Sequence, residues 1–268
     1  MSPCRALVVA TALFITGFET APAFAASMSD LAREKAYADQ IVDQLFVGEA
    51  VWLQAADTRF LGLYAAPEGK NKGLTTAVVL VHGLGVHPSW GFIETFRTEL
   101  VDAGFHTLSL QMPILGEGKN LVDYDPTLPE AFQRLDAGIE YLLGKGVKKI
   151  FLVGHSLGAL TTLVYGSERR KEQIGGIAAL SSPSGPAASK YLQPERMLGR
   201  IQYPVLDVYG ENDIEPALKG AVVRSAVAKQ SKMKNYRQIR IPGANHFYVD
   251  RYDDLKSQVL PWLSRMQK

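Results

Sequence analysis

The chain has 268 residues, of which 47% are hydrophobic and 21% are charged. This composition is too apolar for a disordered protein and too charged for a polytopic membrane protein. Its 29 basic and 27 acidic residues leave a net charge of +2 and form no runs of one sign, so no nucleic-acid-binding surface is expected. The single cysteine, Cys4, excludes an internal disulfide and a cysteine-rich metal site.

The first 25 residues have the features of a secretory signal peptide. Arg5 precedes an apolar run, 6–18, and Ala23-Phe24-Ala25 matches the A-x-A cleavage pattern. The run is shorter than the roughly 20 residues that a membrane-spanning helix needs, and Cys4 lies before it, whereas a lipoprotein cysteine follows it. We therefore predict cleavage after Ala25, a cysteine-free mature chain, no stable membrane anchor and a periplasmic or secreted location.

The mature chain starts with a helical pattern. Apolar residues spaced among charges over residues 29–46 predict an amphipathic helix, with Ser29 or Asp30 as its N-cap. Two strand-like segments and a polar turn are predicted next, at 51–55, 60–64 and 68–73.

After Gly73 the chain alternates between strand-length and helix-length segments. The strand-length runs are mostly continuously apolar, as expected for a parallel sheet covered by helices on both faces. No linker is long enough to separate two domains. We predict one α/β domain, 26–268, with a doubly wound, mostly parallel sheet. The predicted strands are 77–81, 107–110, 150–153, 177–180, 204–208 and 236–241, and the predicted helices are 90–103, 128–143, 157–165, 216–228 and 255–266.

A G-x-S-x-G motif, Gly154-His155-Ser156-Leu157-Gly158, lies between a predicted strand and a predicted helix. The motif alone is weak evidence, but a serine at such a corner is raised above the sheet, where it can act as a nucleophile. The flanking glycines remove side chains that would collide with neighbouring elements. A plain glycine-rich turn and a phosphate-binding loop are the alternatives, although the P-loop and dinucleotide-binding spacings are absent.

An earlier strand ends in His82-Gly83-Leu84-Gly85. A His-Gly pair allows a sharp turn that presents a backbone N–H to a nucleophile, and the N–H groups of Leu84 and Leu157 are the candidate oxyanion donors. A simple glycine turn is the alternative. His82 and His155 both lie inside backbone turns, so we expect structural roles for them.

A serine hydroxyl needs a base within hydrogen-bond reach. His246 has a suitable place, in a loop between the last predicted strand and the last predicted helix. Asp213, just beyond the fifth apolar strand, is the candidate acid that orients it, with Glu211 and Glu215 as runners-up. Asp207 lies inside that strand and is expected to point elsewhere. A helix cap is the alternative role for Asp213.

Together these segments resemble the α/β-hydrolase family. The serine motif, the His-Gly turn, Gly210-x-x-Asp213 and Gly243-x-x-His246 occur in the family's order and spacing, over about 51–268, and the chain looks like an exported branch of the family. The sequence departs from the family at 111–118, where many relatives carry D-x-x-G-x-G. The resemblance implies a nucleophile, a base, an acid and two oxyanion donors, which are Ser156, His246, Asp213, Leu84 and Leu157, without a metal or cofactor.

The substrate side is less clearly marked. The segment between the predicted strands 177–180 and 204–208 is short, which predicts a small or absent cap and an open, mostly apolar site. Such a site favours an ester or thioester over a long charged peptide. His87, Trp90 and Met112 are the candidate substrate-binding residues, with Leu84 and Leu115 as further rim candidates and ordinary packing as the alternative.

These observations lead to one main hypothesis and two alternatives. The main hypothesis is an exported serine hydrolase that cleaves a small-molecule carboxylic ester through an acyl-enzyme. A peptidase or amidase would use the same three residues. A non-catalytic periplasmic binding protein on a hydrolase fold is the alternative from another class.

Overall fold

The computed structural model describes residues 27–71, 73–169 and 171–267, so the predicted signal peptide lies outside the described residues. The strands are β1 (Glu49–Ala55), β2 (Thr58–Ala65), β3 (Thr76–Val81), β4 (His106–Leu110), β5 (Lys149–His155), β6 (Ile174–Leu180), β7 (Val205–Asn212) and β8 (Tyr236–Asn245). The helices are α1 (Leu31–Val42), α2 (Phe92–Asp102), α3 (Leu128–Gly144), α4 (Leu157–Glu168), α5 (Glu215–Gln230) and α6 (Tyr252–Gln267). Short 3₁₀ helices are η1 (Gly69–Asn71), η2 (Leu121–Thr127), η3 (Pro194–Arg196) and η4 (Leu198–Arg200).

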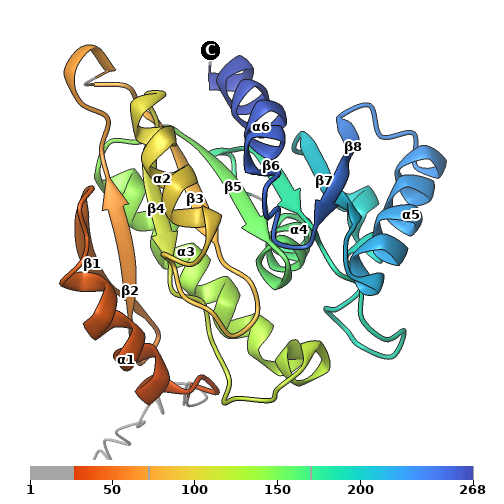
Figure 1. Ribbon diagram of the computed structural model, residues 1–268, viewed down its shortest axis with the longest axis horizontal. Coiled ribbons are helices and arrows are strands. Elements are labelled where there is room, and N and C mark those ends of the chain that lie inside the picture. Colours follow the sequence, from red (N-terminus) through yellow and green to blue (C-terminus); the bar gives the residue numbers. More distant parts are fainter. Residues whose placement is uncertain (1–26, 72, 170, 268) are drawn as a thin grey trace, which may run out of the picture.

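The strands form one sheet in the order β1-β2-β4-β3-β5-β6-β7-β8 (Figure 1). β2 is antiparallel to both of its neighbours, whereas every pair from β4 through β8 is parallel. The predicted doubly wound, mostly parallel sheet is therefore confirmed. β1 and β2 form a hairpin, whose connection is too short for the crossover that parallel pairing requires.

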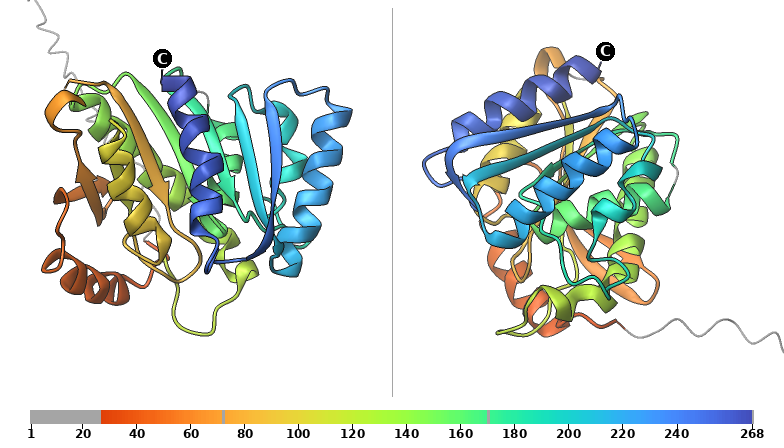
Figure 2. Two further views of the ribbon diagram at one scale, coloured as in Figure 1. Left: turned by 45° about the horizontal axis from the view of Figure 1, so that its top comes forward. Right: turned by 90° about the vertical axis from the view of Figure 1, so that its right-hand side faces the viewer.

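Helices cover both faces of the sheet (Figure 2). Alternate residues of β3 show this arrangement directly, since Val78 and Leu80 pack with α2 and α6, whereas Val79 and Val81 pack with α3 and α4. Each central strand thus buries both of its faces, which explains why these strands are apolar at successive positions.

The carboxyl ends of the parallel strands meet at one edge, which is where open α/β sheets bind ligands. The connection from β6 to β7 contains only η3 and η4, in agreement with the predicted small or absent cap. In the part of the chain that the structure describes, no helix combines the length and hydrophobicity needed to cross a membrane.

Candidate active site

Ser156 occupies the corner between β5 and α4, with a φ angle of 55°. A Cβ atom at Gly154 would lie 2.3 Å from the carbonyl oxygen of Gly158, and one at Gly158 would lie 2.1 Å from that of Val81. Backbone atoms cannot yield to such contacts, so both positions require glycine. The strained corner places the Ser156 hydroxyl at the carboxyl edge of the sheet.

Ser156, His246 and Asp213 form a continuous hydrogen-bonded chain. The Ser156 Oγ lies 2.9 Å from His246 Nε2, and His246 Nδ1 lies 2.6 Å from Asp213 Oδ1. A carboxylate only accepts hydrogen bonds, so Nδ1 carries the proton and Nε2 is free to accept from the serine hydroxyl. This arrangement allows His246 to act as a general base toward Ser156.

Asp213 is held on both carboxylate oxygens. Oδ1 also accepts from the backbone N–H of Ile214 at 2.8 Å, and Oδ2 accepts from that of Gly210 at 3.1 Å. Burial raises the pKa of Asp213, but hydrogen bonds from His246 and Ser181 outweigh burial, and the pKa falls below its ordinary value. The carboxylate is therefore ionised at neutral pH and can stabilise a protonated His246.

The His82-Gly83 turn lies directly against the nucleophile, because a Cβ at Gly83 would be 3.1 Å from Ser156 Cβ. His82 accepts a hydrogen bond from the N–H of Met112 at Nε2 (2.9 Å), so its Nδ1–H donates to the Gly83 carbonyl at 2.8 Å. That carbonyl and the Leu84 N–H share one peptide plane. His82 thus fixes the orientation of a predicted oxyanion donor.

Leu157, the other predicted oxyanion donor, is the first residue of α4. The N–H groups in the first turn of a helix have no intrahelical acceptor and carry the positive end of the helix dipole. Leu84 and Leu157 both line the same cavity as Ser156. The structure therefore brings the five residues of the predicted catalytic set together.

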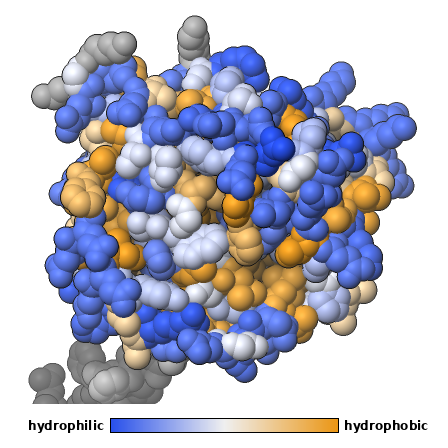
Figure 3. Space-filling model, viewed as in Figure 1, coloured by the Kyte–Doolittle hydropathy of each residue, from blue (hydrophilic) through white to orange (hydrophobic). Residues whose placement is uncertain are grey.

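This cavity, of about 360 Å³, opens over Ser156 and His246 and is mainly apolar. A hollow with hydrophobic walls is visible in Figure 3 on the lower side of the molecule, the side toward which β5 points in Figure 1. The remaining lining residues are Gly83, Leu84, Val86, Trp90, Leu121, His155, Leu157, Pro183, Ile214, Pro216 and Phe247.

Trp90 and Leu84 line the cavity as predicted, but His87, Met112 and Leu115 are not among its lining residues. The Met112 side chain is buried in the core, and its backbone N–H donates to His82 Nε2. The His87 ring instead packs against Tyr37 of α1, with 4.9 Å between ring centroids.

Several lining residues were not predicted from the sequence. Ile214 and Pro216 follow Asp213, Phe247 follows His246, and Leu121 begins η2. Adjacency to the predicted acid and base was a usable signal for the first three. Leu121 gave no such signal, because its position depends on the path of the long connection from β4 to α3.

The other acidic candidates are engaged elsewhere. The Glu211 carboxylate accepts from the Gly243 N–H at 2.9 Å, and Glu215 pairs with Lys219 at 2.6 Å on the exposed face of α5. Asp207 forms a buried ion pair with Arg224. Asp213 is thus the carboxylate that the fold directs to His246.

Two further histidines support the site and remain neutral. Burial lowers the pKa of His82 to about 3 and that of His155 to about 4. His155 Nε2 lies 2.8 Å from the backbone carbonyl of His246, to which it donates. Neither ring contacts Ser156 through a hydrogen bond in the described structure, in keeping with the structural roles expected for both.

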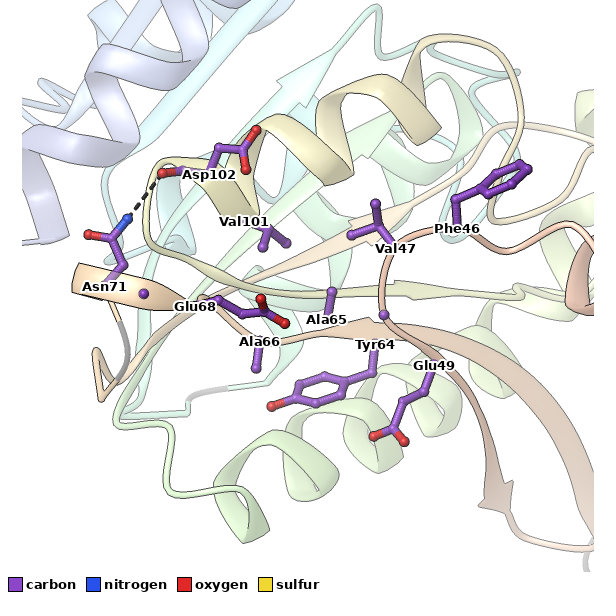
Figure 4. Close-up of a pocket in the computed structure, with 12 residues that line it drawn as sticks. Phe46, Val47, Glu49, Tyr64, Ala65, Ala66, Glu68, Asn71, Val101 and Asp102 are labelled. Carbon is purple, nitrogen blue, oxygen red and sulfur yellow. Dashed lines mark hydrogen bonds between the residues drawn. The ribbon is translucent and has the colours of Figure 1, made fainter.

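A larger cavity, of about 690 Å³, lies away from these residues, beside β2 and the end of α2 (Figure 4). Its three carboxylates, those of Glu49, Glu68 and Asp102, point in different directions. Among the described residues, no group of three or more His, Cys, Asp or Glu side chains is arranged to hold a metal ion. None of the described residues that line this cavity is a serine, cysteine or histidine.

Solved structures with the same fold include Est1E, a dienelactone hydrolase and a monoacylglycerol lipase. Est1E from Butyrivibrio proteoclasticus has a TM-score of 0.64 and 20% identity, covering 81% of this chain and 98% of its own. The dienelactone hydrolase from Anabaena variabilis has a TM-score of 0.63 and 18% identity, covering 81% and 96%. The monoacylglycerol lipase from Paleococcus ferrophilus has a TM-score of 0.60 and 20% identity, covering 78% and 100%.

These similarities confirm the α/β-hydrolase fold that was expected from the sequence. A comparison with curated proteins gives no significant match. The model of a family described as "Protein of unknown function (DUF3530)" matches residues 16–130 and 125–265, which is nearly the whole chain. The protein therefore belongs to the DUF3530 family and has the fold of the α/β hydrolases.

Proposed function

We propose that this protein is an exported serine hydrolase that cleaves carboxylic esters through an acyl-enzyme. The observation that carries the proposal is the chain from Asp213 through His246 to Ser156, with joining distances of 2.6 and 2.9 Å. Its hydroxyl end lies at a strained corner in an apolar cavity. A binding protein would need neither this strain nor a base that is free to accept the serine proton.

In the proposed reaction the Ser156 Oγ attacks the ester carbonyl carbon while His246 Nε2 takes the hydroxyl proton. The N–H groups of Leu84 and Leu157 stabilise the oxygen anion of the tetrahedral intermediate. His246 then protonates the departing alcohol, leaving an acyl group on Ser156. Water, deprotonated by the same histidine, then attacks the acyl carbonyl carbon. The bond from this carbon to Ser156 Oγ breaks, Oγ takes the proton back from His246, and the carboxylic acid leaves.

The cavity favours an ester over a peptide. Its walls are apolar apart from the catalytic groups and His155, so they offer little to the successive amides of a peptide backbone. Its volume of about 360 Å³ is at the small end of the usual range for ligand sites. The names of two similar structures, a dienelactone hydrolase and a monoacylglycerol lipase, add support.

Labelling with a fluorophosphonate tests the activated serine. The reagent should label the wild type and Ser167→Ala, a matched control on α4 whose hydroxyl donates only to a helical carbonyl, but not Ser156→Ala. Matched ester and amide substrates should then show faster turnover of the ester. Persistent labelling of Ser156→Ala, or a folded wild type that neither reacts nor hydrolyses any ester, would contradict the proposal.

Export is tested separately from catalysis. The full-length chain, expressed in a Gram-negative host, should yield a periplasmic or secreted protein with the mass of residues 26–268. A cytoplasmic product that retains residues 1–25 would refute export and leave the catalytic proposal intact.

A further inference from the structure

The hydrogen-bonded chain extends past Asp213 in the other direction. The hydroxyl of Ser181, the residue that follows β6, donates to Asp213 Oδ2 at 2.5 Å. The phenol oxygen of Tyr248 lies 2.8 Å from Ser181 Oγ. Ser181 has one hydroxyl proton, which it gives to the carboxylate, so its oxygen can accept from Tyr248. The Tyr248 hydroxyl donates to Ser181 Oγ at 2.8 Å rather than to its more distant acceptor, the Val208 carbonyl at 3.3 Å. The order is therefore Tyr248, Ser181, Asp213, His246 and Ser156.

Backbone strain is concentrated in this hydrogen-bonded series of five residues. In the described residues, six amino acids other than glycine have positive φ angles, and three of them belong to it: Ser156 at 55°, Ser181 at 52° and Tyr248 at 54°. Such conformations are costly for residues with a side chain. They persist where the surrounding structure holds them in place, and they are found most often at functional sites. Glycine would relieve the strain at Ser181 but would remove the hydroxyl that reaches Asp213.

Ser181 and Tyr248 also connect separate parts of the site. Ser181 follows β6, Asp213 follows β7, and Tyr248 lies two residues after His246 in the loop beyond β8. Ser181 and Tyr248 are almost fully buried, at 0% and 1% exposed. Their hydrogen bonds therefore link the loop that carries the base to the loop that carries the acid, shielded from competing water.

We propose that Ser181, held by Tyr248, is a positioning residue for the serine-hydrolase reaction. It fixes the rotation of the Asp213 carboxylate and so keeps Oδ1 aligned with His246 Nδ1. By donating to Oδ2 it also draws negative charge away from Oδ1, which moderates the stabilisation of a protonated His246. This inference rests on the proposed function, but its structural part can be tested without turnover.

The chain contains a matched control for Ser181. Ser182 is the adjacent residue and is equally buried, but its hydroxyl makes only a long contact, of 3.5 Å, with the Pro183 carbonyl. Replacing either serine by alanine removes one buried hydroxyl from the same loop. Only Ser181→Ala removes a donor from Asp213.

Hydrolysis of p-nitrophenyl butyrate by the two variants tests the proposal. Ser181→Ala should lower kcat by about 10- to 100-fold, because a hydrogen bond to a charged group is lost, and should change KM by less than about threefold. The acidic limb of its kcat/KM profile should move to higher pH, because the carboxylate regains charge toward His246. Ser182→Ala should keep the wild-type kcat and pH profile.

Tyr248→Phe provides a milder change if Ser181→Ala folds poorly. It retains the ring and the hydrogen bond between Ser181 and Asp213 but removes the outer donor, so we expect a fall in kcat of about two- to tenfold. Equal kinetics for Ser181→Ala and Ser182→Ala, with an active wild type, would overturn the inference while leaving the proposed function standing.

Proton NMR gives a readout that does not need a substrate. The Nδ1 proton shared by His246 and Asp213 should give a far-downfield resonance in the wild type and Ser182→Ala, and this resonance should shift or broaden in Ser181→Ala. An unchanged resonance in Ser181→Ala would overturn the inference. A wild type that shows the resonance but no labelling or hydrolysis would instead count against the proposed function alone.

Discussion

Two aspartates near the same strand are both buried, yet their surroundings differ. Asp207 lies inside β7 and pairs with Arg224 through bonds of 2.8 and 3.1 Å, with further donors from Tyr236 and Gln238. Asp213 lies just beyond the end of β7 and orients His246. The Asp207 carboxylate is paired with a guanidinium, whereas the Asp213 carboxylate accepts a hydrogen bond from an imidazole.

The difference shows that burial of a carboxylate does not by itself indicate catalysis. Arg224 holds its proton at all accessible pH values, so its pair with Asp207 can only be structural. His246 Nε2 instead lies 2.9 Å from the Ser156 Oγ, within reach of the hydroxyl proton. The position at the carboxyl end of the strand is what gives Asp213 access to these partners.

The largest expected effect comes from Asp213→Asn. An amide can donate to Nδ1 and so stabilise the wrong tautomer of His246, leaving Nε2 protonated toward Ser156. We expect kcat for an ester to fall by about 10⁴-fold, the size of the effect of the same change in a Ser-His-Asp protease. Urea denaturation should show a much smaller change in the free energy of unfolding than in Asp207→Asn, and near-wild-type kcat would refute the role of Asp213.

The converse effect is expected for Asp207→Asn. It leaves the buried Arg224 without a countercharge, which should lower the free energy of unfolding by about 3–5 kcal/mol. The kcat per folded molecule should remain close to that of the wild type. The double variant Asp207→Leu/Arg224→Met, which removes both charges, should recover much of the lost stability, and failure to do so would indicate that the pair stabilises the fold directly.

The sequence predicted the fold well because its signals are local. Continuous apolar runs identified the parallel strands, and the six predicted helices correspond to α1 through α6 with small shifts at their ends. The catalytic candidates were also predictable, since Ser156, Asp213 and His246 each follow a strand in a recognisable motif. Such motifs are local in sequence even though the residues meet only in the folded protein.

Other parts of the site depend on long-range packing and were not predicted. Ser181 and Tyr248 contact each other across 67 positions, and neither belongs to a motif that signals contact with Asp213. Met112 was misplaced because a residue near the end of a strand can face either the core or the cavity. Here the Met112 side chain faces the core, where it is buried among apolar residues.

Acid should destabilise the protein through the buried histidines beside the active site. The pKa of His82 is about 3 and that of His155 about 4, against an ordinary value of 6.5. As the pH falls from 6.5 to 4, the unfolded chain binds protons that the folded protein refuses, so stability is full above this range and decreases within it. Each histidine should contribute up to about 1.4 kcal/mol per pH unit to the loss.

His155→Phe tests this interpretation, because it removes one titrating ring from an aromatic cluster. The free energy of unfolding, measured in urea between pH 4 and 7, should depend less steeply on pH in the variant than in the wild type. An identical slope in both proteins would show that His155 does not contribute to the acid sensitivity.

The smallest effect is expected at the rim of the cavity that contains Ser156 and His246. Phe247 is 48% exposed and lines the cavity, with its ring 5.3 Å from that of Trp90. Phe247→Ala should lower kcat/KM for a butyryl ester by less than about tenfold, mainly through KM, because a half-exposed ring contributes only part of its burial energy. Val249→Ala is the control, since Val249 is exposed on the same loop but is not a lining residue. Equal losses in both variants would mean that the loop, rather than contact with the Phe247 ring, affects the substrate.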